Sequence, residues 1–153
     1  MGFEAVLWDF GGVITSSPFD AFNRYEAERG LPRDFIRGVN AVNHHENAWA
    51  KFESSRVTVA EFDELFAREP AAAGHEVRGY DVIGLLGGDV RPRMVEVLRR
   101  CKQDYRVACL TNNAKAGQGT GMSSSDEQAG HVKEVMQLFD VIIESSKEGI
   151  RKP

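Results

Sequence analysis

The N-terminal stretch constrains the fold most. A short apolar run over residues 5–8 ends abruptly in Asp9, and Gly11 and Gly12 follow at once. Such a run is typical of a strand buried on both faces, as in a parallel sheet. A carboxylate is costly inside such a strand, but ligand crevices of open α/β sheets lie at its carboxyl end. Glycines there permit a sharp turn and close approach to a ligand. On these residues alone, an ordinary polar turn is the simpler interpretation.

Composition and charge exclude several classes of protein. The chain has 153 residues, of which 42% are hydrophobic and 27% charged, as expected for one soluble domain with a real core. The net charge of -4 argues against a nucleic-acid binder. Apolar runs are too short to span a membrane, and the first residues lack the basic region of a secretory signal. Cys101 and Cys109 have neither metal-type nor redox-type spacing, so we expect reduced cysteines in a cytoplasmic protein.

Residues 16–89 have the spacing of short helices and no strong strand signal. Ser17 before Pro18 is a helix-start signal. Thr58 followed by Glu61 three residues later is a capping box, and Pro70 is expected to end the helix that follows. Helices are thus expected from residue 18 to Gly30, from about residue 33, around residues 49–52, over 59–69 and over 76–86. The segment predicts a helical insertion.

The character of the sequence changes after residue 89. A helix is expected from Pro92 to Lys102, followed by a buried strand over residues 106–110 that runs into Thr111. The remaining elements are a flexible Gly- and Ser-rich loop over 114–126, a helix over 127–139, a strand over 140–144 and a polar tail over 145–153. The Gly-rich run at 117–121 lacks the strand–turn–helix context of a dinucleotide-binding loop.

The order of these elements predicts an α/β fold. A strand, a helical insertion, and then helix, strand, helix and strand imply a parallel sheet with right-handed crossovers. Each strand ends in polar residues, which are Asp9, Thr111 with Asn112, and Glu144 with Ser145. These ends share one edge of a parallel sheet, so a carboxylate, a hydroxyl and an amide can converge on one crevice. That arrangement suits phosphoryl chemistry, with Asp9 as the nucleophile and amides, a hydroxyl and a lysine holding the phosphoryl oxygens.

Three segments carry a resemblance to a known family. They are residues 8–14 (WDFGGVI), residues 107–113 (VACLTNN) and residues 145–153 (SSKEGIRKP). In this order, with helices between the first and second, they resemble the motifs of the haloacid dehalogenase-like (HAD) hydrolases, and within them of small phosphatases with a helical cap. The resemblance implies a three-layer, Rossmann-like parallel-sheet core from residues 1–15 and 90–153, and a helical cap from residues 16–89.

The resemblance also implies roles for individual residues. Asp9 would be the nucleophile and a Mg²⁺ ligand, and the Gly11 carbonyl would be a second ligand. Thr111 would hydrogen-bond the phosphoryl group, and Lys152 would neutralise the charge on the nucleophile and the phosphate. Gly12, Asn112 and Asn113 would take part in substrate binding, with Asn112 supporting the loop that carries Thr111. The cofactor would be Mg²⁺ and the ligand a small phosphorylated metabolite, with no nucleic acid and no membrane involved.

Two departures from the family pattern matter. Phosphatases of this family usually carry a second Asp two residues after the nucleophile, as acid and base, where this chain has Gly11. The acid and base would then come from elsewhere, from water or from the substrate. The chain also ends before the family's fourth, acidic motif, so we expect weak Mg²⁺ binding, impaired hydrolase activity and an exposed sheet edge that favours a homo-oligomer. Lys152, one residue from the terminus, is expected to be poorly ordered, with its charge failing to reach Asp9.

The sequence is therefore compatible with three functions. The leading one is Mg²⁺-dependent phosphomonoester hydrolysis through an aspartyl-phosphate on Asp9. The first alternative is a metal-independent dehalogenation of a small 2-halo acid, whose branch usually has an aromatic residue where this chain has Gly11. The second is a non-catalytic binding or regulatory module, favoured by the missing acid and base and by the missing fourth motif.

Overall fold

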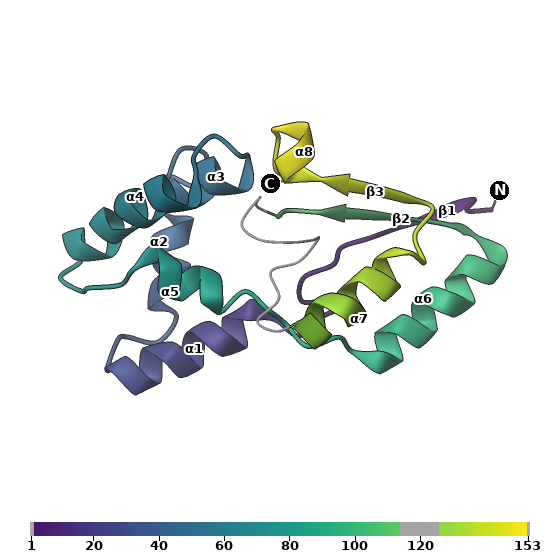
Figure 1. The fold of residues 1–153 in the computed structure, drawn as a ribbon, viewed down its shortest axis with the longest axis horizontal. Coiled ribbons are helices and arrows are strands. Elements are labelled where there is room, and N and C mark those ends of the chain that lie inside the picture. Colours follow the sequence, from purple (N-terminus) through teal and green to yellow (C-terminus); the bar gives the residue numbers. More distant parts are fainter. Residues whose placement is uncertain (1, 114–125, 153) are drawn as a thin grey trace.

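A three-stranded parallel sheet organises one half of the molecule (Figure 1). The computed structural model describes residues 2–113 and 126–152. Strands β1 (Ala5–Trp8), β2 (Arg106–Thr111) and β3 (Val141–Glu144) lie in the order β1-β2-β3. Trp8 pairs with Cys109, and Thr111 pairs with Glu144. The predicted parallel sheet is confirmed, and its register brings the carboxyl ends of all three strands to one edge.

Two helices cover one face of this sheet. They are α6 (Pro92–Asp104) and α7 (Asp126–Met136). Their apolar sides join the inward residues of the sheet in one hydrophobic cluster. It contains Trp8, Phe10, Ile14, Val95, Leu98, Val107, Cys109, Val132, Val135, Met136 and Phe139.

The prediction that the strands are buried on both faces is wrong for the outer residues. The side chain of Leu7 in β1 is 61% exposed and that of Val141 in β3 is 54% exposed. The reason is that α6 and α7 pack on the same side. The apolar runs therefore located the strands correctly. They did not show that the described helices cover only one face of the sheet.

The other half of the molecule contains helices between β1 and α6. They are α1 (Pro18–Arg29), α2 (Phe35–Ala41), α3 (Ala48–Glu53), α4 (Val59–Ala72) and α5 (Gly79–Gly84). Aromatic rings fill its separate core: Phe52 stacks on Phe62 with centroids 4.4 Å apart, and Trp49 meets Phe62 edge-on at 5.7 Å. Residues 16–89 are called the cap below and the rest of the chain the core; this division into domains stays a prediction, which the two separate hydrophobic clusters support.

Local sequence signals set the helix starts as expected. The Ser17 side chain accepts a hydrogen bond from the Phe19 N–H at the start of α1, and Gly30 ends that helix with a left-handed φ of 65°. Thr58 and Glu61 form the complete capping box of α4.

Several predicted boundaries are corrected. Helix α4 continues through Pro70 to Ala72, although proline cannot donate its backbone hydrogen bond and crowds the carbonyl four residues earlier. The Pro70 side chain is fully buried, and this packing offsets the cost. Helix α7 ends at Met136, and the chain from there to Phe139 forms tighter turns. The predicted polar tail begins with a one-turn helix, α8 (Ser145–Glu148). The predicted loop over 114–126 lies outside the described residues, except that Asp126 already belongs to α7.

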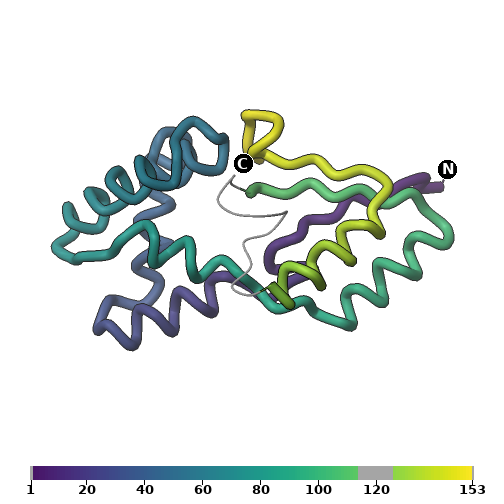
Figure 2. Tube along the Cα trace, viewed as in Figure 1, coloured from purple at the N-terminus to yellow at the C-terminus, as the bar shows by residue number. Residues whose placement is uncertain are grey.

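The two connections between cap and core run side by side (Figure 2). The Ser16 N–H donates to the Asp89 carbonyl at 2.8 Å, and Thr15 and Val90 form an antiparallel bridge. Gly88 is required here, because a Cβ at that position would lie 2.6 Å from the Ser16 carbonyl oxygen. The chain thus leaves and re-enters the core at one narrow joint.

Within residues 2–113 and 126–152, every helix is too short or too polar to cross a bilayer.

Candidate active site

Asp9 lies directly after β1, in the position that the sequence predicted. Its Oδ1 accepts a hydrogen bond from the Phe10 N–H at 2.7 Å. The chain then turns tightly, with the Ile14 N–H donating to the Phe10 carbonyl at 2.8 Å. Gly12 has a φ of 77°, which other residues rarely adopt. Gly12 therefore lets the backbone turn sharply after the carboxylate.

Lys152 reaches this carboxylate from the C-terminal segment. Its Nζ lies 2.6 Å from Asp9 Oδ2 and donates to the Leu110 carbonyl at 3.0 Å. The expectation that its charge fails to reach Asp9 is wrong. The reason is that Asn112 holds the Lys152 backbone at both polar atoms: the Lys152 N–H donates to Asn112 Oδ1 at 2.9 Å, and Asn112 Nδ2 donates to the Lys152 carbonyl at 3.3 Å.

Asn112 and Asn113 make hydrogen bonds that hold the third motif in place. Both polar atoms of the Asn112 side chain bond the Lys152 backbone, and Asn113 Oδ1 accepts from the Ser146 N–H at 3.2 Å. The Asn113 N–H donates to Ser145 Oγ at 2.9 Å. Their predicted role in substrate binding stays a prediction, while their hydrogen bonds give both residues a role in positioning the third motif.

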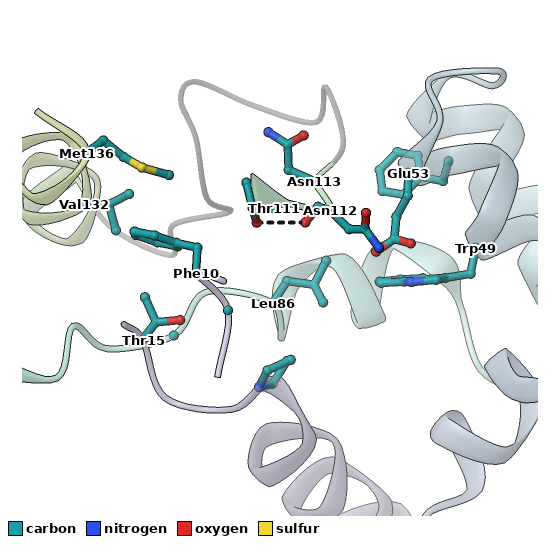
Figure 3. A pocket seen from close by; sticks show the side chains of 14 residues that line it. Phe10, Thr15, Trp49, Glu53, Leu86, Thr111, Asn112, Asn113, Val132 and Met136 are labelled. Carbon is teal, nitrogen blue, oxygen red and sulfur yellow. Dashed lines mark hydrogen bonds between the residues drawn. The ribbon is translucent and has the colours of Figure 1, made fainter. Parts of the chain in front are cut away.

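A cavity of about 160 Å³ opens between the strand ends and the cap (Figure 3). Thr111, only 6% exposed, lines it from β2, together with Gly11 from the turn after Asp9. Thr111 Oγ1 donates a long hydrogen bond of 3.3 Å to the Asn112 carbonyl. The structure thus brings the ends of β1 and β2 together as predicted, whereas Glu144 at the end of β3 is buried and pairs with Lys147 at 2.5 Å.

The cap contributes the opposite wall of this cavity. Trp49, Phe52 and Glu53 of α3 line it, as does Leu86 from the segment after α5. Figure 3 shows the Glu53 carboxyl beside Asn112 and the Trp49 ring. The cap therefore presents an apolar surface with one carboxyl group to the space beside the strand ends.

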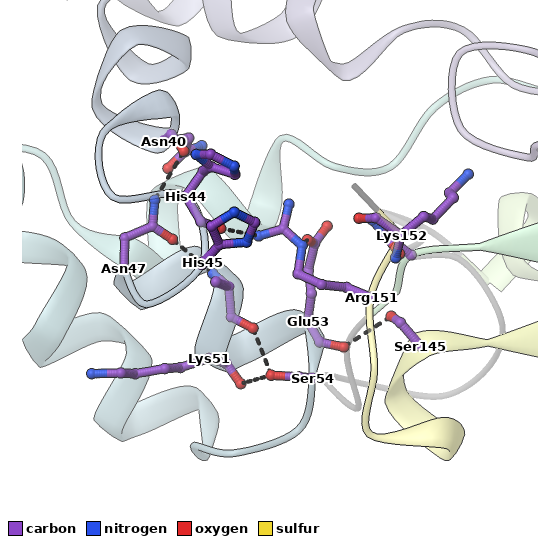
Figure 4. Close-up of polar contacts among 12 residues, drawn as sticks. Asn40, His44, His45, Asn47, Lys51, Glu53, Ser54, Ser145, Arg151 and Lys152 are labelled. Carbon is purple, nitrogen blue, oxygen red and sulfur yellow. Dashed lines mark hydrogen bonds and ion pairs between the residues drawn. The ribbon is translucent and has the colours of Figure 1, made fainter.

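Cap and core are joined by polar contacts that sequence reasoning missed (Figure 4). Arg151 Nε lies 3.1 Å from Glu53 Oε2, and Arg151 Nη1 donates to the His44 carbonyl at 3.1 Å. Ser145 Oγ donates to the Glu53 carbonyl at 2.9 Å, and Ser55 Oγ donates to the Ser146 carbonyl at 3.0 Å. The available signal was that Arg151 and Ser145 belong to the third motif, but nothing in that motif named their cap partners.

Arg91 fixes the turn after Asp9 from the other side. Its Nη1 donates to the carbonyls of Gly12 at 3.2 Å and Val13 at 3.3 Å. Since Arg91 directly precedes α6, this contact ties the glycine turn to the helix that covers the sheet. Arg91 was not among the predicted site residues, because its position before Pro92 indicated only a helix start.

The electrostatics of the site are dominated by the pair of Asp9 and Lys152. The side chain of Asp9 is 47% exposed and that of Lys152 is 25% exposed, so the pair is open to a ligand. Behind it, burial and the negative charge of Asp9 raise the pKa of the Cys109 thiol to about 12. The thiol is therefore protonated and takes no part as a nucleophile.

The oxygen donors at this edge fit Mg²⁺ in kind. Mg²⁺ prefers oxygen ligands, keeps several waters and is commonly held by one or two carboxylates together with substrate phosphate. Asp9 supplies a half-exposed carboxylate directly after β1, and Gly11, two residues later, lines the cavity. Among the described residues there is no group of three or more His, Cys, Asp or Glu side chains placed to hold a metal. The roles of Asp9 and the Gly11 carbonyl as Mg²⁺ ligands therefore stay a prediction.

Comparison with solved structures identifies the fold. The chain superposes on a HAD family enzyme from Bacteroides thetaiotaomicron, solved in complex with magnesium and inorganic phosphate, with a TM-score of 0.57 and 17% identity over 99% of this chain and 73% of that one. It superposes on the HAD-hydrolase YfnB from Bacillus subtilis, solved bound to magnesium, with a TM-score of 0.58 and 17% identity over 100% of this chain and 70% of that one. The chain therefore has the fold of the HAD hydrolases, as its three motifs implied.

Two curated mouse proteins are similar in sequence. Acyl-CoA dehydrogenase family member 10 is 28% identical over 164 residues, which cover 99% of this chain and 14% of that protein. Bifunctional epoxide hydrolase 2 is 24% identical over 164 residues, covering 100% of this chain and 29% of that protein. The chain thus spans less than a third of either relative. No model of a known protein family matches it.

Proposed function

We propose that the protein is a Mg²⁺-dependent phosphomonoester hydrolase that acts through an aspartyl-phosphate on Asp9. The observation that carries the proposal is the contact of 2.6 Å between Lys152 Nζ and Asp9 Oδ2 at the carboxyl edge of a parallel sheet. An ammonium at this position neutralises two anions, a carboxylate and a phosphate, that would otherwise repel each other. The magnesium-bound solved structures of the same fold support the choice of metal.

The residues can perform the reaction in two steps. An Asp9 carboxylate oxygen attacks phosphorus, and the bond between phosphorus and the ester oxygen breaks with its electron pair on the leaving oxygen. Water then attacks the phosphorus of the aspartyl-phosphate, and the bond from Asp9 to phosphorus breaks to return the carboxylate. Lys152 balances the charge on the phosphoryl oxygens, while the Leu110 carbonyl accepts a hydrogen bond from its ammonium and the amide of Asn112 holds its backbone. A bound Mg²⁺ would polarise the phosphoryl group as a Lewis acid.

The cap supports a small phosphorylated metabolite as substrate. Trp49 and Phe52 form apolar wall opposite Thr111, and the cavity of about 160 Å³ is small. A cap that covers the reacting centre excludes water and selects the ester group. Substrate choice is therefore assigned to the cap, and the phosphate to the strand ends.

Phosphate release from a panel of small phosphomonoesters tests this proposal. We expect release that requires Mg²⁺ and stops with a chelator, and that falls on the order of 10³-fold or more in Asp9→Asn. Asp104→Asn, at the exposed end of α6, is the matched control and should retain the wild-type rate.

Other outcomes separate the alternatives. Halide release from a 2-halo acid that survives chelation would favour the dehalogenase. If folded wild-type protein releases neither phosphate nor halide but binds inorganic phosphate equally well with and without Asp9→Asn, the chain is a binding module and the enzyme proposal is wrong.

A further inference from the structure

The proposed reaction needs a proton donor that the nucleophile turn does not supply. The leaving oxygen of an alkyl phosphate must be protonated as its bond to phosphorus breaks, and water must lose a proton when it attacks the aspartyl-phosphate. Gly11 has no side chain to do either. Among the described residues that line the cavity, Glu53 is the one with an acidic side chain.

The position of Glu53 is well determined by its neighbours. It is the last residue of α3, and its backbone carbonyl accepts the hydrogen bond of 2.9 Å from Ser145 Oγ in the core. Its side chain is only 12% exposed and points into the cavity beside Asn112 (Figure 3). Ser145 therefore holds the backbone of Glu53, and Arg151, 3.1 Å from Oε2, holds its carboxyl group beside Asn112 at the end of β2.

The carboxyl group is incompletely satisfied. Glu53 Oε2 lies at ion-pair distance from Arg151 Nε, but no hydrogen bond from a described residue reaches this buried oxygen. A buried polar atom without a hydrogen bond is uncommon and costs stability unless it serves a purpose. A substrate oxygen in the cavity would provide the missing partner.

We propose that Glu53 is the general acid and general base of the phosphoryl transfer, supplied by the cap in place of the side chain that Gly11 lacks. This inference rests on the proposed function. In the first step the Glu53 carboxylic acid gives its proton to the leaving oxygen as that oxygen takes the electron pair of the breaking bond to phosphorus. In the second step the Glu53 carboxylate takes a proton from the attacking water, and the group returns to its starting state.

The electrostatic surroundings of Glu53 suit both steps. Burial raises the pKa of its carboxyl, while Arg151, the Trp49 indole and Lys152 pull that pKa down by less. A raised pKa keeps a carboxylic acid protonated closer to neutral pH, where it can donate. The same Lys152 ammonium acts on Glu53 and contacts Asp9, so the acid and the nucleophile share one cation.

Leaving-group dependence of kcat/KM in Glu53→Gln tests the proposal. We compare ethyl phosphate, whose alkoxide needs protonation, with 4-nitrophenyl phosphate, whose phenolate leaves without it, both with Mg²⁺. The variant should lose about 10²- to 10⁴-fold in kcat/KM for ethyl phosphate and change only a few-fold for 4-nitrophenyl phosphate. It should also show a burst of nitrophenolate followed by slow turnover, because the aspartyl-phosphate accumulates when no base activates water.

Further variants exclude a purely structural role. Glu53→Asp keeps an acid and should recover part of the ethyl phosphate activity. Glu46→Gln, an exposed cap glutamate paired with Arg56, is the control and should match wild type. Ser55→Ala removes a cap–core hydrogen bond and should affect both substrates alike.

Each remaining outcome decides the matter. Equal losses of kcat/KM for both substrates in Glu53→Gln would show that the carboxyl only holds the cap. Unchanged kcat/KM for both would show that the carboxyl has no role. Either result, in a variant whose fold is verified by circular dichroism, overturns the proposal. If wild-type protein hydrolyses neither ester with Mg²⁺, the proposed function itself fails, which is a different result from an active wild type with an unaffected variant.

Discussion

Replacing Gly88 by alanine should destabilise the joint between cap and core. Gly88 lies in the connection from α5 back to the core, where it faces the outgoing connection. An added Cβ would be 2.6 Å from the Ser16 carbonyl oxygen and 3.0 Å from Thr15 Cβ. The nearest obstacle is a backbone atom, so the clash cannot be relieved by rotating a flexible side chain.

The size of the effect follows from this geometry. Over-packing of a well-filled site costs about 1–3 kcal/mol, and moving the two connections apart also weakens the 2.8 Å hydrogen bond from the Ser16 N–H to the Asp89 carbonyl. Gly38→Ala is the matched control. Gly38 lies exposed within α2, and an added Cβ there meets nothing within 4 Å. Alanine should therefore stabilise that helix by about 0.5–1 kcal/mol.

Urea unfolding followed by far-UV circular dichroism measures both changes. The two variants should differ by about 1.5–4 kcal/mol, with midpoints on opposite sides of wild type and similar slopes. A Gly88→Ala variant as stable as wild type would refute the reasoning, because it would mean that the connections separate at no cost. A loss of stability in Gly38→Ala would equally show that the contacts around the two glycines were misjudged.

Two further predictions concern titratable groups. Burial and the charge of Asp9 raise the pKa of Cys109 to about 12. A disulfide reagent at pH 8 should therefore modify only Cys101 in the folded chain and both thiols in denaturant. Rapid reaction of two thiols in the native protein would contradict the assigned burial. The hydrogen bond and charge of Lys102, together with a backbone N–H of β2, lower the pKa of Asp140, so this carboxylate contributes stability above its unfolded pKa, and that contribution is lost as pH falls through the lowered folded pKa. Asp140→Asn should accordingly be less stable than wild type at pH 7 in urea unfolding, with the gap narrowing under acid conditions, whereas a gap that is constant with pH would rule out a charge effect.

Much of the fold could be predicted from the sequence, because the signals are local. Apolar runs that end in polar residues located the strands, and the cap of Ser17 and the capping box of Thr58 located the starts of α1 and α4. Boundaries that depend on longer-range packing were less accurate. The passage of α4 through Pro70 is an example, since it depends on the burial of the Pro70 side chain in the cap, which the local sequence does not show.

The sequence by itself determined that Asp9, Thr111 and the end of β3 share one edge of a parallel sheet, because strand direction follows from the order of elements. The tertiary structure alone decided what meets that edge. It brought the Lys152 ammonium to Asp9 and placed the Asn112 side chain where it bonds the Lys152 backbone. It also placed Glu53 of the cap in contact with Ser145, a residue 92 positions away. No periodicity or spacing encodes such a contact, because it depends on how the packed cap rests on the packed core.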